Sequence, residues 1–269
     1  MSTDKLLVFR TVYLRAITEA WVDGKFREEL TSPEPGAAIR ALKARFDYDW
    51  PWPLVCDLEI ASAPDQYEWI SDEWVWSRGM HETLQMPLPL DPEELKIPTE
   101  YHAMALADYY RQRSSLFSDD WNAGGTRDPK QSPRAMLGGE SGLNDGAPAG
   151  GFMPSDNEFS AFKVALLAAI AKAWREPAFK RMLIIDAATA LHAVREYKLP
   201  WKFTLVVVED RTSVWHPQER PGSQSQWSFE TRNTLKLKFP TRPADVKCWP
   251  VALAAYNATG SEYPFSCCT

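Results

Sequence analysis

The sequence has no hydrophobic run long enough to span a membrane. A spanning helix needs about 18–20 apolar residues, whereas the longest apolar stretch, Val164 to Ala171, is flanked by Lys163 and Lys172. The N-terminal segment MSTDKLLVFR also lacks the basic region, apolar core and small-residue cleavage site of a secretory signal. We therefore expect a cytoplasmic protein with no membrane partner.

Cysteine is also scarce, and acidic residues outnumber basic ones. The 4 cysteines among 269 residues cannot form the disulfide framework of a small secreted protein, and the 4 histidines show no metal-ligand spacing. The 30 Lys and Arg residues against 36 Asp and Glu give a net charge of -6, which disfavours nucleic-acid binding. The sequence thus predicts no cofactor, no metal site and no nucleic-acid partner. Hydrophobic residues make up 45% of the chain, enough for a folded core.

What the sequence does contain is an internal repeat. At an offset of 153 residues the matching pairs are Phe9–Phe162, Ala16–Ala169, Ile17–Ile170, Ala20–Ala173, Trp21–Trp174, Phe26–Phe179 and Leu30–Leu183. An insertion in the first copy, around Pro33–Gly36, changes the offset to 149, and the pairs become Ala41–Ala190, Leu42–Leu191, Tyr48–Tyr197, Pro51–Pro200 and Trp52–Trp201. Ordered pairs of Trp, Phe and Pro do not arise by chance, so the chain carries two tandem copies of one module.

The repeat continues with a drifting offset. The later pairs are Leu84–Leu235, Pro89–Pro240, Ala105–Ala252 and Phe117–Phe265. Residues 121–156 between the copies are rich in Gly, Pro, Asp and Ser, which predicts a flexible linker. We divide the chain into a first module at 1–120, a linker at 121–156, a second module at 157–256 and a C-terminal peptide at 257–269.

Each copy is predicted to be α+β, with helices first and a small sheet second. Apolar residues recur at three- and four-residue steps from Phe9 to Trp21 and from Phe162 to Trp174, which predicts amphipathic helices. A second helix should follow through Phe26 or Phe179, and a third should end near Tyr48 or Tyr197. Strands are expected at 54–60 and 203–208. The alternation in 234–239 predicts a half-buried strand that closes the second copy.

The second copy resembles the nitrile-hydratase-α-like leader of ribosomally made, post-translationally modified peptides. The residues that carry this resemblance are Trp174, Pro177, Ala178, Phe179, Leu183, Ala190, Leu191, Leu199, Pro200, Val206 to Val208, Glu209 and His216. Glu176 takes the place of the usual Asp, Ala187 stands where Pro is common, and the first copy fits more loosely. The resemblance implies a leader that processing enzymes recognise. The candidate recognition residues are Trp174, Phe179, Leu183, Leu191 and Val207.

The chain ends in Ser266, Cys267, Cys268 and Thr269. Such a tail behind such a leader is similar to precursors of thiazole/oxazole-modified microcins. This resemblance implies that a cyclodehydratase closes azoline rings on these four residues, cysteine before Ser and Thr because sulfur is the better nucleophile. An iron-dependent oxidase acting on cysteine is the second chemistry. A peptidase or exporter would then release a bacteriocin-like or metal-binding product.

The first copy ends in Phe-Ser-Asp-Asp, so it looks like a leader that has lost its substrate. It would then serve as a docking or pairing partner, and two packed copies would form a pseudo-dimer on one chain. The chain itself is not expected to be an enzyme. A divergent nitrile-hydratase-like metalloenzyme stays open as an alternative, although the Cys-x-x-Cys-Ser-Cys claw is missing. A scaffold or small-metal-binding protein with an unmodified tail is the other alternative.

Overall fold

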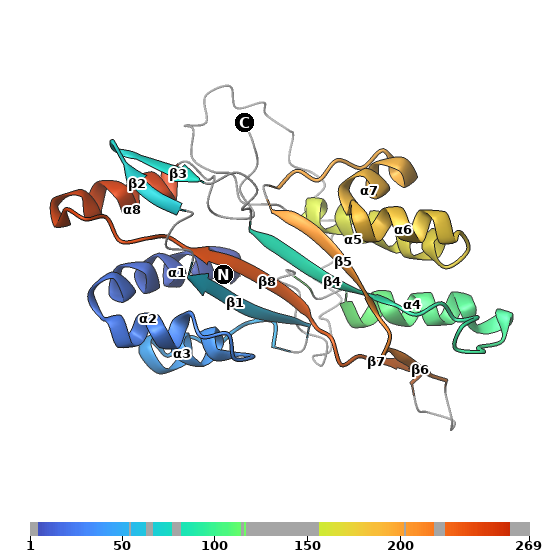
Figure 1. Cartoon of the computed structure of the whole chain (residues 1–269). Coiled ribbons are helices and arrows are strands. Elements are labelled where there is room, and N and C mark those ends of the chain that lie inside the picture. The colour runs from blue at the N-terminus through green and yellow to red at the C-terminus, as the bar shows by residue number, and fades with distance from the viewer. Residues whose placement is uncertain are drawn as a thin grey trace, which may run out of the picture.

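The computed structural model describes residues 5–53, 55–62, 67–76, 82–113, 116, 156–201, 203–217 and 224–258. Each copy begins with three helices and continues with a strand, a two-stranded hairpin, a second strand and a final helix (Figure 1). The fold is α+β in two tandem modules, as the sequence predicted. Within these residues, no helix is long and apolar enough to cross a lipid bilayer.

Three helices open the first copy: α1 Lys5–Val22, α2 Gly24–Leu30 and α3 Ala37–Phe46. The apolar face of α1 is buried because its apolar residues recur at helical spacing. Helix α2 begins where the Asp23 carboxylate accepts hydrogen bonds from the backbone N–H groups of Lys25 and Phe26, at 3.0 and 3.1 Å. Gly36, with φ of +72°, allows the chain to enter α3. The predicted helices are confirmed.

The second copy repeats this arrangement with α5 Asp156–Ala173, α6 Pro177–Ile185 and α7 Ala187–Arg195. Pro177 occupies the first turn of α6, where its missing N–H costs nothing. Asp186 ends α6 and caps α7, since its carboxylate accepts from the Thr189 N–H at 3.0 Å. The same three helices thus form twice from local sequence signals.

The strands also occur as matched sets. The first copy contributes β1 Cys56–Ser62, the hairpin of β2 Tyr67–Ile70 and β3 Glu73–Trp76, and β4 Thr83–Pro89. The second contributes β5 Thr204–Asp210, the hairpin of β6 Val214–His216 and β7 Gln226–Ser228, and β8 Asn233–Phe239. After a 3-10 turn (Thr99–Tyr101 or Val246–Cys248), the copies end in α4 His102–Arg113 and α8 Trp249–Ala258. We did not predict α4 and α8.

The four long strands form one sheet in the order β1-β8-β4-β5, and each strand has its neighbours in the other copy. Strands β1 and β8 are parallel, β8 and β4 antiparallel, and β4 and β5 parallel. All three of these pairs join one copy to the other. The prediction that 234–239 closes the second copy is therefore wrong about its partner. This strand pairs with β1 and β4 of the first copy and not with β5.

A pseudo-two-fold axis passes through the centre of this sheet. Leu84 and Leu235, which the repeat equates, lie directly opposite each other in the β4–β8 pair. The flanking pairs are Thr83 with Lys236 and Gln85 with Thr234, which the same two-fold interchanges. The axis explains the alternation of parallel and antiparallel neighbours, because each parallel pair is the symmetry mate of the other.

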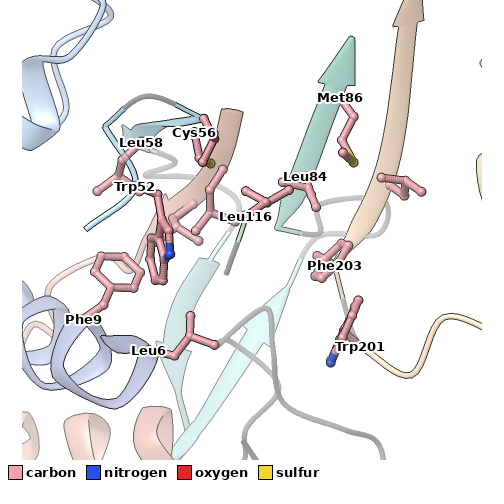
Figure 2. Close-up of a cluster of buried hydrophobic side chains, with 14 of the residues drawn as sticks. Leu6, Phe9, Trp52, Cys56, Leu58, Leu84, Met86, Leu116, Trp201 and Phe203 are labelled. Carbon is pink, nitrogen blue, oxygen red and sulfur yellow. The ribbon is translucent and has the colours of Figure 1, made fainter. Parts of the chain in front are cut away.

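The core is one continuous cluster that contains side chains of both copies. Figure 2 shows Phe9 and Trp52 of the first copy on one side and Trp201 and Phe203 of the second on the other, with Leu84 between them. Matching aromatic contacts recur in each half. The Phe9 ring lies 6.4 Å from the Tyr48 ring, and the equivalent Phe162 ring lies 6.4 Å from the Tyr197 ring. The sheet and core thus bind the two copies into one structure.

Candidate functional site

The four candidate modification residues, Ser266, Cys267, Cys268 and Thr269, lie outside the described residues. Helix α8 ends at Ala258, just before the tail. What the structure describes is therefore how the tail is attached to the leader. The contacts of α8 define that attachment, and the matched helix α4 provides a comparison within the same molecule.

Helix α8 of the second copy is held by aromatic side chains of the first. The Trp74 Nε1–H donates to the Ala252 carbonyl at 2.8 Å, and the Trp74 and Tyr256 rings lie 6.2 Å apart. Trp249 lies 5.9 Å from the Trp21 ring. Tyr256 also packs edge-on to Tyr13 at 6.4 Å. Figure 1 shows α8 beside the β2–β3 hairpin, on the side of the molecule that holds α1.

Tyr13 makes a second link between the copies. Its hydroxyl donates to the carbonyl oxygen of Lys238 at 3.2 Å. Burial, reinforced by the charge of Glu82, raises the pKa of this hydroxyl far above its ordinary value. The Tyr13 hydroxyl is therefore a buried hydrogen-bond donor that links the two copies.

Helix α4 of the first copy is held by the second copy in the same way. The Trp227 Nε1–H donates to the Ala105 carbonyl at 2.7 Å. Trp227 lies 153 residues after Trp74, and Ala252 lies 147 residues after Ala105. These two indole hydrogen bonds are therefore symmetry mates, and each joins the hairpin of one copy to the final helix of the other.

Polar side chains make the α4 contact different from the α8 contact. The buried Asp108 carboxylate accepts from the Trp215 Nε1–H at 2.9 Å and pairs with Arg111 at 3.0 Å. Arg111 also donates to the Ser225 carbonyl, at 2.5 Å. Gln112 exchanges two hydrogen bonds with the backbone of Trp227, at 2.8 and 2.9 Å. At the position of Asp108, α8 carries Ala255.

The candidate recognition residues lie in the interior rather than on a surface. Phe179, Leu183, Leu191 and Val207 are all buried, with exposed fractions of 4%, 0%, 0% and 3%. Only Trp174 is partly exposed. Its Nε1–H donates to the Pro89 carbonyl of the first copy at 3.1 Å. These five side chains hold the helices and strands together, so an enzyme would meet the surface that they support.

The described part of the chain contains no group of three or more His, Cys, Asp or Glu side chains that could hold a metal ion. Cys56 is fully buried in β1, as expected for a core residue. Cys248 is half-buried beside Trp249 and is a free thiol. Neither cysteine belongs to a cluster of ligands, so the described residues give no support to the metalloenzyme alternative.

A family model matches the chain twice, over residues 4–117 and 157–264. Its description is the ribosomal natural product, two-chain TOMM family, where TOMM stands for thiazole/oxazole-modified microcin. The two matches cover most of the chain. The chain belongs to this family. No curated protein and no solved structure matches the chain.

Membership of this family makes the chain a precursor of a ribosomally made natural product. The two matched regions confirm the two copies deduced from the repeat. The second match ends at residue 264, so the family pattern stops immediately before Phe-Ser-Cys-Cys-Thr. The residues that sequence analysis missed are Trp74, Trp227 and Asp108. The only signal for the two tryptophans was their common offset of 153 residues, and nothing marked Asp108.

Proposed function

We propose that the folded part of this chain is a leader and that its C-terminal peptide, residues 257–269, is the part converted into the product. The leader recruits a modifying enzyme, and a peptidase or exporter then releases the product as a bacteriocin-like or metal-binding compound. The observation that carries this proposal is the family match to both copies, followed by a tail with adjacent cysteines. The chain acts as a substrate and not as a catalyst.

The proposed chemistry is ring closure at Cys267 and Cys268. The Cys267 sulfur attacks the carbonyl carbon of Ser266, and a C–S bond forms. An ATP-using cyclodehydratase activates the amide oxygen, which leaves with the phosphate, so the peptide loses one water and a thiazoline results. Cys268 closes on the carbonyl of Cys267 in the same way. Ser266 and Thr269 are weaker candidates for the corresponding oxazolines, because oxygen is the poorer nucleophile.

We also propose that the two copies act as a pair, like a homodimer on one chain. The pseudo-two-fold at Leu84 and Leu235 supports this view. The first module, 1–120, then serves as the pairing partner of the second, 157–256, and residues 121–156 connect the two. The enzyme would recognise the surface that surrounds Trp174 and the four buried candidate residues.

The test is tandem mass spectrometry of the tail, on protein purified from the native host with its neighbouring genes intact. We expect the loss of one or two waters at Cys267 and Cys268. An oxidative mass change at either cysteine would keep the precursor function and replace the cyclodehydratase with an oxidase. An unmodified tail together with metal bound to the protein would reject the proposal in favour of a metalloprotein.

Cysteine variants locate the chemistry. Cys267→Ala and Cys268→Ala should each remove one modification, and deletion of residues 267–269 should abolish the product while the protein folds normally. Cys248→Ala is the matched control, because this thiol is half-buried beside the attachment of α8 and not in the tail. A modified mass that survives in the Cys267→Ala, Cys268→Ala double variant would contradict the assignment to cysteine. Loss of folding in the deletion variant would contradict the separation of leader and tail.

A further inference from the structure

We propose that the two copies complete each other by exchanging their C-terminal segments, so that the first copy holds the helix from which the second copy's tail extends. The exchanged segments are β4 with α4 and β8 with α8. This inference rests on the proposed function only where it concerns modification of the tail. It assigns a specific task to the copy that carries no tail cysteines.

Reciprocal hydrogen bonds carry the argument. The Trp21 Nε1–H donates to the Pro240 carbonyl at 3.1 Å, and the Trp174 Nε1–H donates to the Pro89 carbonyl at 3.1 Å. The repeat equates Trp21 with Trp174 and Pro89 with Pro240. Each bond therefore runs from the C-terminal end of the first helix of one copy, or the residue just after it, to the end of the exchanged strand of the other. A fold that was complete within one copy would place both partners in that copy.

The hairpins repeat the same reciprocity at the helices. Trp74 of the first copy bonds to Ala252 of α8, and Trp227 of the second bonds to Ala105 of α4. The strand ladders agree, because β8 lies beside β1 and β4 beside β5. Strand, hairpin and helix contacts thus all cross between the copies. A single copy alone would leave the ladder edge and the apolar faces of its helices without partners.

Polar contacts of α4 also favour pairing between a first copy and a second copy over pairing between two first copies. Asp108, Arg111 and Gln112 of α4 bond to Trp215, Ser225 and Trp227 of the second copy. The corresponding part of α8 is alanine-rich and fits the aromatic contacts made by Trp74, Tyr13 and Trp21. Two first copies pairing with each other would place a second Asp108 carboxylate at the half-buried position that Ala255 occupies in this structure, among the aromatic side chains that hold α8, which disfavours that pairing. The partner of each copy is thus the other member of the pair.

The tail consequently leaves the fold from the side built on the first copy. Only a short segment separates Ala258 from Cys267, and an extended chain spans at most about 3.3–3.6 Å per residue. An enzyme that reaches Cys267 therefore acts within roughly 30 Å of the end of α8, which α1 and the β2–β3 hairpin of the first copy hold. The first copy then positions the substrate although it supplies none.

Amide hydrogen exchange, measured on the full-length, unmodified protein, tests directly whether each copy holds the C-terminal segment of the other. Loss of one hydrogen bond of typical strength speeds local opening about fivefold. Trp74→Phe should speed amide exchange in α8 by about this factor and leave α4 unchanged, whereas its symmetry mate Trp227→Phe should do the reverse. The proposal fails if each variant speeds exchange only within its own copy, or if both variants speed exchange equally in both helices.

Expression of the chain as two pieces, split between Ala135 and Met136, tests whether the copies complete each other. With an affinity tag on the first piece only, both pieces should purify together in equal amounts and elute at the size of the 30.5 kDa chain. Asp108→Ala in the first piece should weaken this capture. Two pieces that purify separately as folded monomers would overturn the proposal. Neither experiment needs a modified tail, so failure here is distinguishable from failure of the precursor function.

The tail-holding role has its own readout in the native host. Trp74→Phe should lower the modified fraction of the tail, whereas Trp227→Phe, which removes the equivalent bond to α4 on the opposite side of the molecule (Figure 1), should leave it near the parent level. Equal modified fractions in the two variants would reject the positioning role of the first copy. The modified fraction of the parent protein is the reference. The comparison therefore applies only when the tail of the parent is modified, as the proposed function requires.

Discussion

At the residue scale, the most informative side chain is Asp108. It is a buried carboxylate, only 7% exposed, that is charge-paired with Arg111 and accepts from the indole N–H of Trp215. Removal of one partner of a buried hydrogen bond leaves the other unsatisfied, which typically costs about 1–3 kcal/mol. We therefore expect Asp108→Ala to lower the free energy of unfolding by about 1–3 kcal/mol. Asp108→Asn should cost less, because the amide oxygen still accepts from Trp215.

Urea denaturation of the two variants and of the parent chain measures this difference. Glu100→Ala is the control, since Glu100 is an exposed acid on the turn that leads into α4. Substitutions of exposed residues of this kind usually change the free energy of unfolding by no more than about 0.5 kcal/mol. A cost for Asp108→Ala as small as that of the control would show that the carboxylate contributes nothing to holding α4.

At the element scale, an ion-pair network joins α6 to its surroundings. The Lys180 ammonium pairs with Glu209 on β5 and, at 3.1 Å, with Glu94 of the first copy. The hydrogen bond from Lys180 lowers the pKa of Glu209, burial opposes this, and Arg211 adds to the lowering. A folded-state pKa below the unfolded one stabilises the protein above the unfolded value of 4.5, and this contribution is lost as pH falls through the lowered pKa.

Lys180→Gln should therefore destabilise the protein at about pH 7 and lose part of that effect at about pH 3, which lies below the unfolded carboxylate pKa values. Urea denaturation at the two pH values measures the change. Lys25→Gln is the matched control, because Lys25 forms an exposed pair with Glu29 at 3.9 Å, and such pairs contribute little. An effect of Lys180→Gln that is the same at both pH values would contradict the ion-pair assignment.

At the scale of the whole molecule, one sheet and one core predict a single unfolding transition. Because β8 and β4 are central strands and belong to different copies, neither copy can unfold without breaking the sheet of the other. We expect the full chain to unfold in one cooperative step, with coincident curves from tryptophan fluorescence and far-ultraviolet circular dichroism. Two separated transitions would indicate that each copy is stable by itself.

The Leu84 and Leu235 positions extend this argument to the symmetry axis. Both side chains are fully buried and face each other across the β4–β8 pair. Leu84→Ala and Leu235→Ala should each cost about 2–5 kcal/mol, and both should shift the single transition without splitting it. If either variant unfolded in two steps, the substituted leucine would stabilise only one half of the core.

Much of this architecture was present in the sequence. The repeat predicted two copies, and local signals predicted the first three helices of each, because spacing, Asp23, Asp186 and Pro177 act over a few residues. Helices α4 and α8 were missed, since their alanine-rich segments show little contrast between faces. The tail cysteines were found from sequence alone and remain proposals. Of the first-copy aromatic residues that attach α8, the repeat marked only Trp21, through its match with Trp174.

What only the tertiary structure decided is which copy each strand pairs with. The sequence determined that 234–239 alternates apolar and polar residues, and the same pattern suits a ladder with β1 or with β5. Because the two copies carry equivalent strands, local sequence does not distinguish a partner in the same copy from its symmetry mate. The choice is made by contacts between residues far apart in the chain, such as Trp74 with Ala252 and Asp108 with Trp215. The sequence alone therefore determined the module, whereas long-range packing decided that two modules form one exchanged fold.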